Sequence, residues 1–207
     1  MVGMTSSARV YAGVDGDRRR AERRAQLIEA GLDLLGAAEG EPVVSVRGVC
    51  KHAGLATRYF YESFPDRDAF AVAVYDHATS RIAESTLRAV AEAPPQERAL
   101  VRACVATIVR DVSADPRLGR LVFSGPVTAV LARRRLESAR MFVGLTTAQV
   151  VDFYDLPAGS EVDLVAHFVV GGLAQILTAW LDGAVDVDTD VLVERCTDLM
   201  LAVAPIV

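Results

Sequence analysis

The densest group of hydrogen-bonding side chains in the sequence follows a short Ala-Gly-Leu segment at residues 53–55. Thr57, Arg58, Tyr59 and Tyr61 come directly after this segment. An arginine can donate two hydrogen bonds to a guanine edge, and this is the commonest specific contact between proteins and DNA. Threonine can contact a base or a phosphate, and tyrosine hydroxyls can donate to phosphates. These residue types therefore favour contact with nucleic acid.

Two short helices are expected to position these side chains. Ser45 stands where an N-cap should be, before a predicted helix over 46–53. Gly54 can adopt the positive φ that ends this helix, and a second helix is predicted over 57–64. This layout is that of a helix-turn-helix, whose second helix enters the major groove. The predicted DNA-contacting residues are Ser45, Arg47, Thr57, Arg58, Tyr59, Tyr61 and Arg67.

Apolar residues at helical spacing recur along the rest of the chain. We predict an all-α protein of about nine helices, because strand-like alternation is weak. The buried side of the motif is predicted to consist of Val46, Val49, Leu55, Phe60 and Phe64, above Leu34 and Leu35. The other helices are predicted over residues 18–39, 66–91, 96–113, 116–122, 126–154, 160–181 and 188–202.

Charge is distributed unevenly over the 207 residues. Residues 1–70 hold ten basic and ten acidic side chains, so the net charge of −5 belongs to the remainder. Five arginines lie within residues 18–24, and contact with a DNA backbone is as plausible for them as a solvated face. Residues 1–17 are predicted to form a disordered arm. The three cysteines are widely spaced, which indicates reduced thiols in a cytoplasmic protein.

The segment SVRGVCKHAGLATRYFYESFPDRDAF, residues 45–70, resembles the DNA-binding signature of TetR/AcrR-type transcriptional regulators. The sequence Trp-Leu-Asp-Gly at 180–183 also resembles many members. The resemblance implies an all-helical homodimer, more often a repressor than an activator, with a divergent ligand-binding domain. Ala56 departs from the capping serine that is common there, so Thr57 is the alternative cap. Arg58 replaces a frequent glycine and adds a base contact.

The resulting prediction is a ligand-responsive regulator that releases a palindromic operator when a small apolar effector binds. It divides the chain into a disordered arm (1–17), a DNA-binding domain (18–66) and an effector-binding and dimerisation domain (67–207). The predicted effector pocket is lined by Cys104, Thr107, Ile108, Phe123, Met141, Leu145, His167 and Trp180. The predicted homodimer interface lies on the last two helices and includes Gly171, Gly172, Leu173, Ala174, Leu177 and Leu181.

Several other functions lack support in the sequence. No nucleophile elbow, phosphate-binding glycine loop or zinc-protease motif is present, so we predict neither an enzyme nor a cofactor or metal site. Asp163 and His167 lie four residues apart and are interpreted as an ion pair or a polar pocket lining. The uncharged run over 164–181 is interpreted as a buried or interface helix and not as a membrane span. The alternative function is a helical module that binds a small molecule or a protein without DNA.

Overall fold

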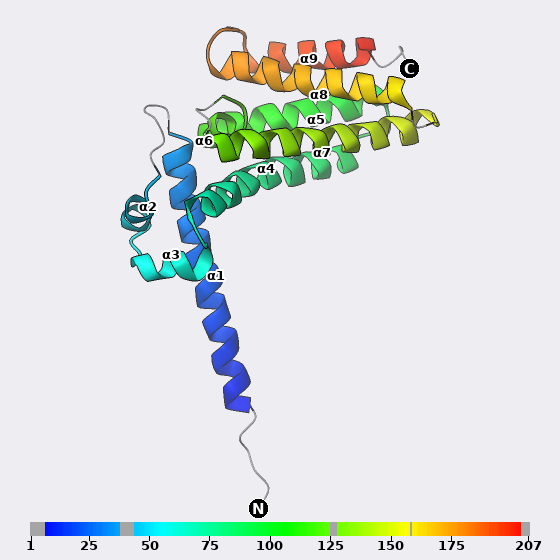
Figure 1. Cartoon of the computed structure of the whole chain (residues 1–207). Coiled ribbons are helices and arrows are strands. Elements are labelled where there is room, and N and C mark those ends of the chain that lie inside the picture. Colours follow the sequence, from blue (N-terminus) through cyan, green and yellow to red (C-terminus); the bar gives the residue numbers. More distant parts are fainter. Residues whose placement is uncertain (1–6, 38–43, 125–127, 158, 204–207) are drawn as a thin grey trace, which may run out of the picture.

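The structure is a computed structural model that describes residues 7–37, 44–124, 128–157 and 159–203. The described residues form helices without any strand, which confirms the all-α prediction (Figure 1). The elements are α1 (Ser7–Leu35), α2 (Val46–His52), α3 (Thr57–Ser63), α4 (Arg67–Glu92), α5 (Glu97–Ala114), α6 (Pro116–Gly119), the π-helix η1 (Arg120–Ser124), α7 (Ala129–Tyr154), α8 (Ser160–Leu181) and α9 (Thr189–Val203).

Helices α2 and α3 lie beside α1 at one end of the molecule, and α4 to α9 form a layered bundle at the other end (Figure 1). The N-terminal half of α4 packs against α1, and its C-terminal half runs under the bundle. Asp66 caps α4, because its carboxylate accepts a hydrogen bond from the Ala69 amide at 2.8 Å. One long helix therefore connects the helix-turn-helix to the rest of the protein.

Helix α1 differs from the prediction at both ends. It begins at Ser7, so residues 7–17 are helical where a disordered arm is expected, and residues 1–6 lie outside the described residues. Adding turns to an existing helix is far less costly than nucleating one, which explains the extension. At the other end α1 stops at Leu35 and not at Glu39. The Gly36 carbonyl instead accepts a hydrogen bond from Arg120 Nε at 2.6 Å.

The predicted helix over 116–122 is also interrupted. Helix α6 ends at Gly119 and continues as the π-helix η1. A Cβ added at Gly119 would lie 3.0 Å from Leu181 Cδ1, so this turn lies close against α8. A single π-turn of this kind often marks a functional segment of a helix. The start of α7 lies at Ala129, with Thr128 as its N-cap, and residues 125–127 of the predicted start lie outside the described residues.

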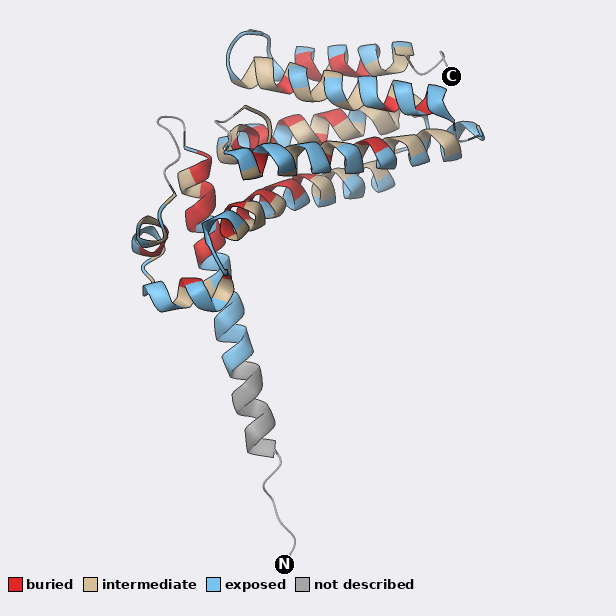
Figure 2. Ribbon diagram, in the orientation of Figure 1, coloured by how far each residue is buried: buried red, intermediate tan, exposed pale blue. Residues whose placement is uncertain are grey.

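Two groups of buried apolar side chains hold the described residues together (Figure 2). The larger group joins the helix-turn-helix to the bundle without a gap, because it includes side chains of α1 to α4 and also Val112, Leu118, Leu121 and Leu131. The smaller group lies between α5, α8 and α9 and consists of Val105, Val109, Leu177, Leu192, Val193 and Cys196. The core is thus continuous across residue 66, where the sequence predicts a domain boundary.

Helix α8 is long and apolar enough to cross a membrane by length and composition alone. Only 11% of its most apolar window is buried inside the protein. Of the two predicted alternatives, burial within the chain is therefore wrong for most of this helix, and a place in an interface stays a prediction. Leu164 and Phe168 on α8 are 71% and 66% exposed, and they leave an apolar face open to solvent.

Candidate nucleic-acid interface and ligand cavity

The turn between α2 and α3 has the predicted geometry. Ser45 caps α2, because its Oγ accepts a hydrogen bond from the Gly48 amide at 3.0 Å. Gly54 adopts φ +67°, a left-handed conformation that favours glycine. Helix α3 begins at Thr57 with Ala56 as its N-cap, and no side chain caps it. The alternative in which Thr57 caps a later helix is therefore wrong.

Aromatic packing fixes the inner face of α3. Phe60 and Phe64 are buried, and both contact Phe70 of α4, with ring centroids 5.2 and 5.0 Å apart. A Cβ added at Gly31 of α1 would lie 2.5 Å from Val74 Cγ2 and 2.6 Å from the Phe70 ring, so α4 packs closely on α1. Such packing holds α3 rigidly on α1 and α4.

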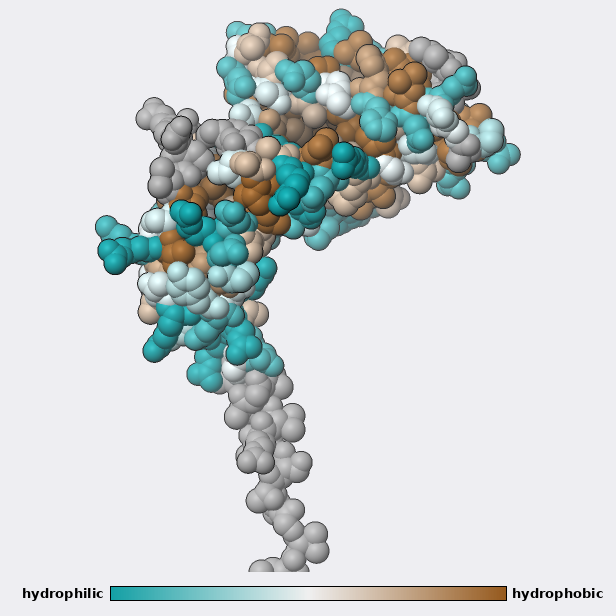
Figure 3. Space-filling view, viewed as in Figure 1, coloured by the Kyte–Doolittle hydropathy of each residue, from teal (hydrophilic) through white to brown (hydrophobic). Residues whose placement is uncertain are grey.

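The outer face of α3 carries the predicted contact residues. Thr57, Arg58 and Tyr61 are exposed, and Tyr61 is 59% exposed. Arg47 on α2 and Arg67 at the start of α4 are exposed as well. Figure 3 shows hydrophilic side chains gathered over α2, α3 and the adjoining part of α1. Five of the seven predicted residues therefore have exposed side chains that are available to DNA, and a sixth, Ser45, uses its hydroxyl oxygen as the helix cap.

Tyr59 lies differently from the prediction. Its side chain is half-buried, and the guanidinium of Arg23 on α1 lies 4.4 Å from its ring centroid. Arg58 lies on the same ring at 4.7 Å, and its Nη2 donates a hydrogen bond to Tyr59 Oη at 2.8 Å. Ser63 on the same turn donates its hydroxyl to the Tyr59 carbonyl. Tyr59 therefore positions two arginines and contacts α1, a role that spacing in the sequence did not reveal.

Part of the arginine cluster on α1 belongs to the same surface. Arg23 also pairs with Glu62 of α3, with 3.6 Å between Nη2 and Oε2. Arg24 lies 5.0 Å above the Phe64 ring. Arg18 pairs with Glu22 on an exposed part of α1. The packing of Arg23 and Arg24 against α3 places positive charge beside the exposed face of that helix, where backbone phosphates would lie.

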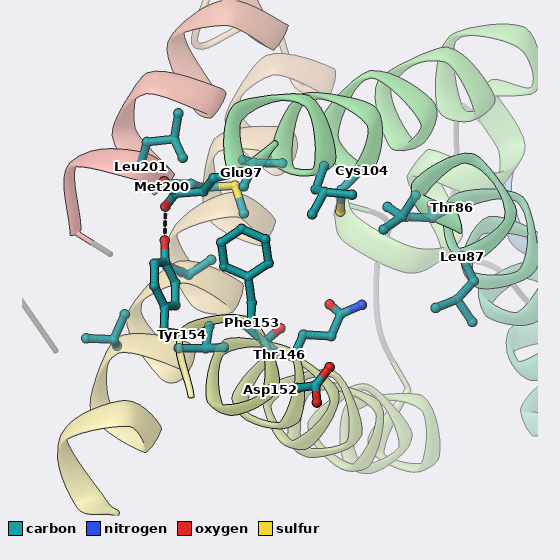
Figure 4. A pocket seen from close by; sticks show the side chains of 17 residues that line it. Thr86, Leu87, Glu97, Cys104, Thr146, Asp152, Phe153, Tyr154, Met200 and Leu201 are labelled. Atoms are coloured by element: carbon teal, nitrogen blue, oxygen red, sulfur yellow. Dashed lines mark hydrogen bonds between the residues drawn. The ribbon is translucent and has the colours of Figure 1, made fainter. Parts of the chain in front are cut away.

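A cavity of about 330 Å³ that is open to solvent on one side lies at the opposite end of the bundle (Figure 4). Side chains from α4, α5, α7, α8 and α9 line it, and most are apolar. Glu97 and Tyr154 lie at one end and are joined by a hydrogen bond from the tyrosine hydroxyl to Glu97 Oε1, whereas Cys104 and Thr86 lie at the other end. The lining comprises Thr86, Leu87, Val90, Glu97, Leu100, Val101, Cys104, Thr146, Gln149, Val150, Asp152, Phe153, Tyr154, Val165, Val169, Met200 and Leu201.

Of the predicted pocket residues, Cys104 lines this cavity. Thr107 is fully buried elsewhere on α5, whereas Met141 and Leu145 lie exposed on α7. Ile108, Phe123 and Trp180 pack against the apolar core, and the Trp180 indole donates a hydrogen bond to the Val187 carbonyl. His167 is exposed and lies 2.8 Å from the Asp163 carbonyl oxygen, so the ion pair and the polar lining are both wrong. The sequence pattern could not show which apolar helix faces border the cavity, because that depends on how the helices pack.

The residues predicted to form the dimer interface differ in how far they are exposed. Leu177 is only 1% exposed and packs in the core between α5 and α9. Gly171 is exposed, whereas Gly172, Leu173, Ala174 and Leu181 are half-buried. Exposed apolar side chains occur on several helices, and we call the group on α8 and the neighbouring α7 the α7/α8 face: Met141, Leu145, Leu164 and Phe168. These helices are adjacent, because Thr147 Oγ1 donates a hydrogen bond to Asp163 Oδ1 at 3.0 Å.

A network of ionic contacts joins α6 to α1 and α2. Arg117 of α6 contacts Asp115 at 2.8 Å, Glu29 of α1 at 2.8 Å, and Asp33 of α1. Asp33 in turn lies 2.8 Å from His52 Nε2 of α2. Burial raises the pKa of Asp33, but hydrogen bonds from His52 and Arg117 outweigh it and leave this pKa below its usual value. The network connects the bundle to the helix-turn-helix.

Among the described residues, no group of three or more histidine, cysteine, aspartate or glutamate side chains could hold a metal ion. Cys50 and Cys196 are buried free thiols, and Cys104 is a free thiol in the cavity wall. Burial raises the pKa of the Cys104 thiol to about 11, so it is protonated at neutral pH and a poor nucleophile.

Comparison with known proteins extends the description of the fold. No protein-family model matches the chain, and no curated protein matches it. Among solved structures, it is similar to the fatty acid degradation regulator FadR from Bacillus halodurans, with a TM-score of 0.70 and 18% identity over 86% of this chain and 94% of that one. It is similar to FadR from Bacillus subtilis in complex with stearoyl-CoA, with a TM-score of 0.66 and 16% identity over 85% and 96%.

A TetR-family transcriptional regulator from Streptomyces coelicolor has a TM-score of 0.66 and 19% identity, over 89% of this chain and 82% of that one. These similarities extend over both the helix-turn-helix and the bundle, because they cover most of each chain. The fold of this protein is therefore that of TetR-like transcriptional regulators, as the signature over residues 45–70 implies.

Proposed function

We propose that this protein is a DNA-binding transcriptional regulator whose α3 enters the major groove. The observation that carries the proposal is the outer face of α3, where Arg58 and Tyr61 are exposed on a helix fixed by Phe60 and Phe64. Arg58 near the start of α3 would contact base edges, while Arg47 and Arg67 would contact phosphates. Ser45 is also proposed to contact DNA, because it is exposed at the start of α2. Thr57, at the start of α3, would contact a base or a phosphate.

We infer that Tyr59 contributes to DNA binding by placing arginines and not through its own hydroxyl alone. Arg58 lies on the Tyr59 ring and is oriented by a hydrogen bond to its hydroxyl group. Holding a long side chain near its binding conformation reduces the entropy lost on binding. The phenol and guanidinium would then reach the DNA together.

A palindromic operator requires two copies of α3 about one turn of DNA apart. We propose a homodimer formed through the α7/α8 face, because that face leaves large apolar side chains exposed on two adjacent helices. Leu164 and Phe168, spaced four residues apart on α8, provide its most exposed area. Two such helix pairs would bury each other's apolar surface, which is the main source of association free energy.

The cavity among α4, α5, α7, α8 and α9 is the proposed effector site. Its volume of about 330 Å³ and mostly apolar lining are typical of small-molecule sites. Thr86 and Leu87 of α4 line it, and the other end of α4 packs on α1, so a ligand could change the position of α3 through this helix. We propose repression with release of the operator on effector binding; a ligand achieves this only if its affinities for the two arrangements differ.

The rival function is a helical module that binds a small molecule or protein without DNA. A mobility-shift assay with the DNA upstream of the protein's own coding sequence distinguishes the two. We expect a shifted complex that requires Arg58 and weakens steeply with salt. Absence of any complex with that DNA at low salt, from a protein that is folded and dimeric, would contradict the regulator function and favour the rival.

A further inference from the structure

We propose that the cavity binds a small amine, with an apolar body inside and a cationic nitrogen beside Glu97. This inference rests on the proposed function in one respect: it takes the cavity to be the effector site. The charges on its lining carry the argument. Glu97 and Asp152 are the charged residues among those that line it, and no lysine or arginine occurs among the lining residues that the structure describes.

The position of Glu97 concentrates negative charge at one end. Glu97 is half-buried, and the Tyr154 hydroxyl donates a hydrogen bond to it (Figure 4). A phenol donor is neutral, so it supports the carboxylate without cancelling its charge. The nearest basic side chains along α5 are engaged elsewhere: Arg98 pairs with Glu194 and Asp198, and Arg102 pairs with Glu194. The carboxylate charge therefore remains for a ligand.

Aromatic rings at the same end favour a cation for a second, independent reason. Phe153 and Tyr154 both line the cavity, and their rings pack edge to face with centroids 5.0 Å apart. The face of an aromatic ring attracts ammonium groups, and aromatic side chains recognise alkylated ammonium ligands in this way. An anionic ligand would be repelled by the carboxylates of Glu97 and Asp152.

The far end of the cavity has a group that is still without a partner. The Thr86 hydroxyl oxygen is buried and makes no hydrogen bond within the structure. Cys104, beside it in Figure 4, is a neutral thiol. A buried hydroxyl without a partner is unfavourable, and a ligand with a polar atom at this end would satisfy it. Most of the remaining lining is aliphatic, with Thr146 and Gln149 as its polar members, so the body of the ligand is mostly apolar.

The volume sets the size of the ligand body that the cavity can cover. About 330 Å³ covers roughly ten non-hydrogen atoms, and a longer ligand would extend through the open side. Stearoyl-CoA, which is bound in the structure of Bacillus subtilis FadR, is far larger and carries several negative charges. The chain shares a fold with that protein but not, we infer, its ligand class.

Three probes of matched length test the proposal: octylamine, octanol and octanoate. An alkylamine has a pKa like that of lysine and is cationic at pH 7. Isothermal titration of the full chain at low salt should show octylamine binding roughly tenfold tighter than octanol, with octanoate weakest, as expected for one charge pair at the protein surface. Equal or tighter binding of octanoate, or no binding of any probe, overturns the proposal.

Variants locate the charge preference. Glu97→Gln should lower octylamine affinity about fivefold and leave octanol affinity unchanged, which also shows that the cavity is intact. Asp152→Asn should have a smaller effect, because Asp152 is exposed. Asp186→Asn, in an exposed loop outside the cavity, serves as the matched control and should change neither affinity. An amine preference that survives Glu97→Gln overturns the assignment.

A mobility-shift assay in the presence of octylamine separates this inference from the proposed function. Binding by titration together with release of the operator supports both. Binding with the charge preference but without any effect on the protein–DNA complex supports the amine site and contradicts its role as the effector site. Operator release by octanoate but not by octylamine contradicts the amine inference and leaves the regulator function standing.

Discussion

Arg117→Ala should destabilise the protein more than its surface position suggests. Arg117 contacts Asp115, Glu29 and Asp33, which lie on α1 and on the turn before α6. The side chains of Arg117 and Asp115 are only 29% and 16% exposed, and two of the arginine nitrogens donate to this aspartate. Truncation therefore leaves Asp115 partly buried with fewer partners.

The expected loss in the free energy of unfolding follows from how far each partner of Arg117 is exposed. A hydrogen-bonded pair such as Arg117–Asp115 contributes about 1.5–3 kcal/mol, and a pair with an exposed carboxylate such as Glu29 contributes about 0–1 kcal/mol. We expect the free energy of unfolding to fall by about 2–3 kcal/mol. For a chain of this length that corresponds to a melting temperature lower by roughly 5–10 °C.

The cost of Arg117→Ala should depend on pH. Hydrogen bonds from Arg117 lower the pKa of Asp115, and Asp33 also has a lowered pKa. A carboxyl group with a lowered folded-state pKa stabilises the protein above its unfolded value and loses that contribution as pH falls through the folded value. The ordinary aspartate value here is 3.8, so the variant should differ most at pH 7 and progressively less below about pH 4.

Thermal unfolding followed by circular dichroism at pH 7 and at several values down to pH 3 measures this effect. Arg195→Ala is the matched control, because Arg195 is 78% exposed and its partner Asp198 is 43% exposed. Its cost should stay under about 0.5 kcal/mol. A wild-type melting temperature for Arg117→Ala at pH 7, or a cost that does not shrink at low pH, would refute the reasoning.

Three further predictions concern DNA contact, assembly and packing. Arg58→Ala should weaken operator binding by about 1–3 kcal/mol and relax specificity at one operator position. Arg67→Ala should weaken binding to all DNA sequences alike and reduce the dependence of binding on salt. Mobility shifts with operator DNA and with mutated DNA, at several salt concentrations, measure both effects. Phe168→Glu should yield a folded monomer in analytical ultracentrifugation, but Leu177→Glu should lower the melting temperature sharply, because Leu177 is 1% exposed in the core; the reverse pattern contradicts the α7/α8 face. Gly31→Ala should cost about 1–3 kcal/mol in chemical denaturation, since the added methyl meets Val74 and Phe70; an unchanged midpoint would disprove close packing there.

The helix-turn-helix is the part that sequence reasoning described best. Capping and turn signals are local, because Ser45 bonds an amide three residues later and Gly54 adopts φ +67° within its own turn. Helix α8 has the predicted bounds of Ser160 and Leu181 for the same reason. The predicted DNA-contacting residues remain predictions, although their exposure on α3 agrees with that role.

The partners of individual side chains could not be predicted in this way. His52 and Asp33 are 19 residues apart, and Arg117 is 84 residues from Asp33, so no short spacing connects them. Tyr59 illustrates the same point, because Arg23 reaches its ring from another helix. The periodicity of α8 likewise identified Leu177 as apolar but could not say whether another helix of the same chain would cover it.

The sequence by itself determined which segments are helical, where most of them end and which short helix presents arginine and tyrosine side chains, because these properties depend on neighbours within a few residues. Only the tertiary structure decided where the cavity lies, which apolar face stays exposed and which carboxylates surround Arg117. Each of these depends on how helices distant in sequence pack, and a helix face reads as apolar whether it meets a core, a cavity or a second molecule.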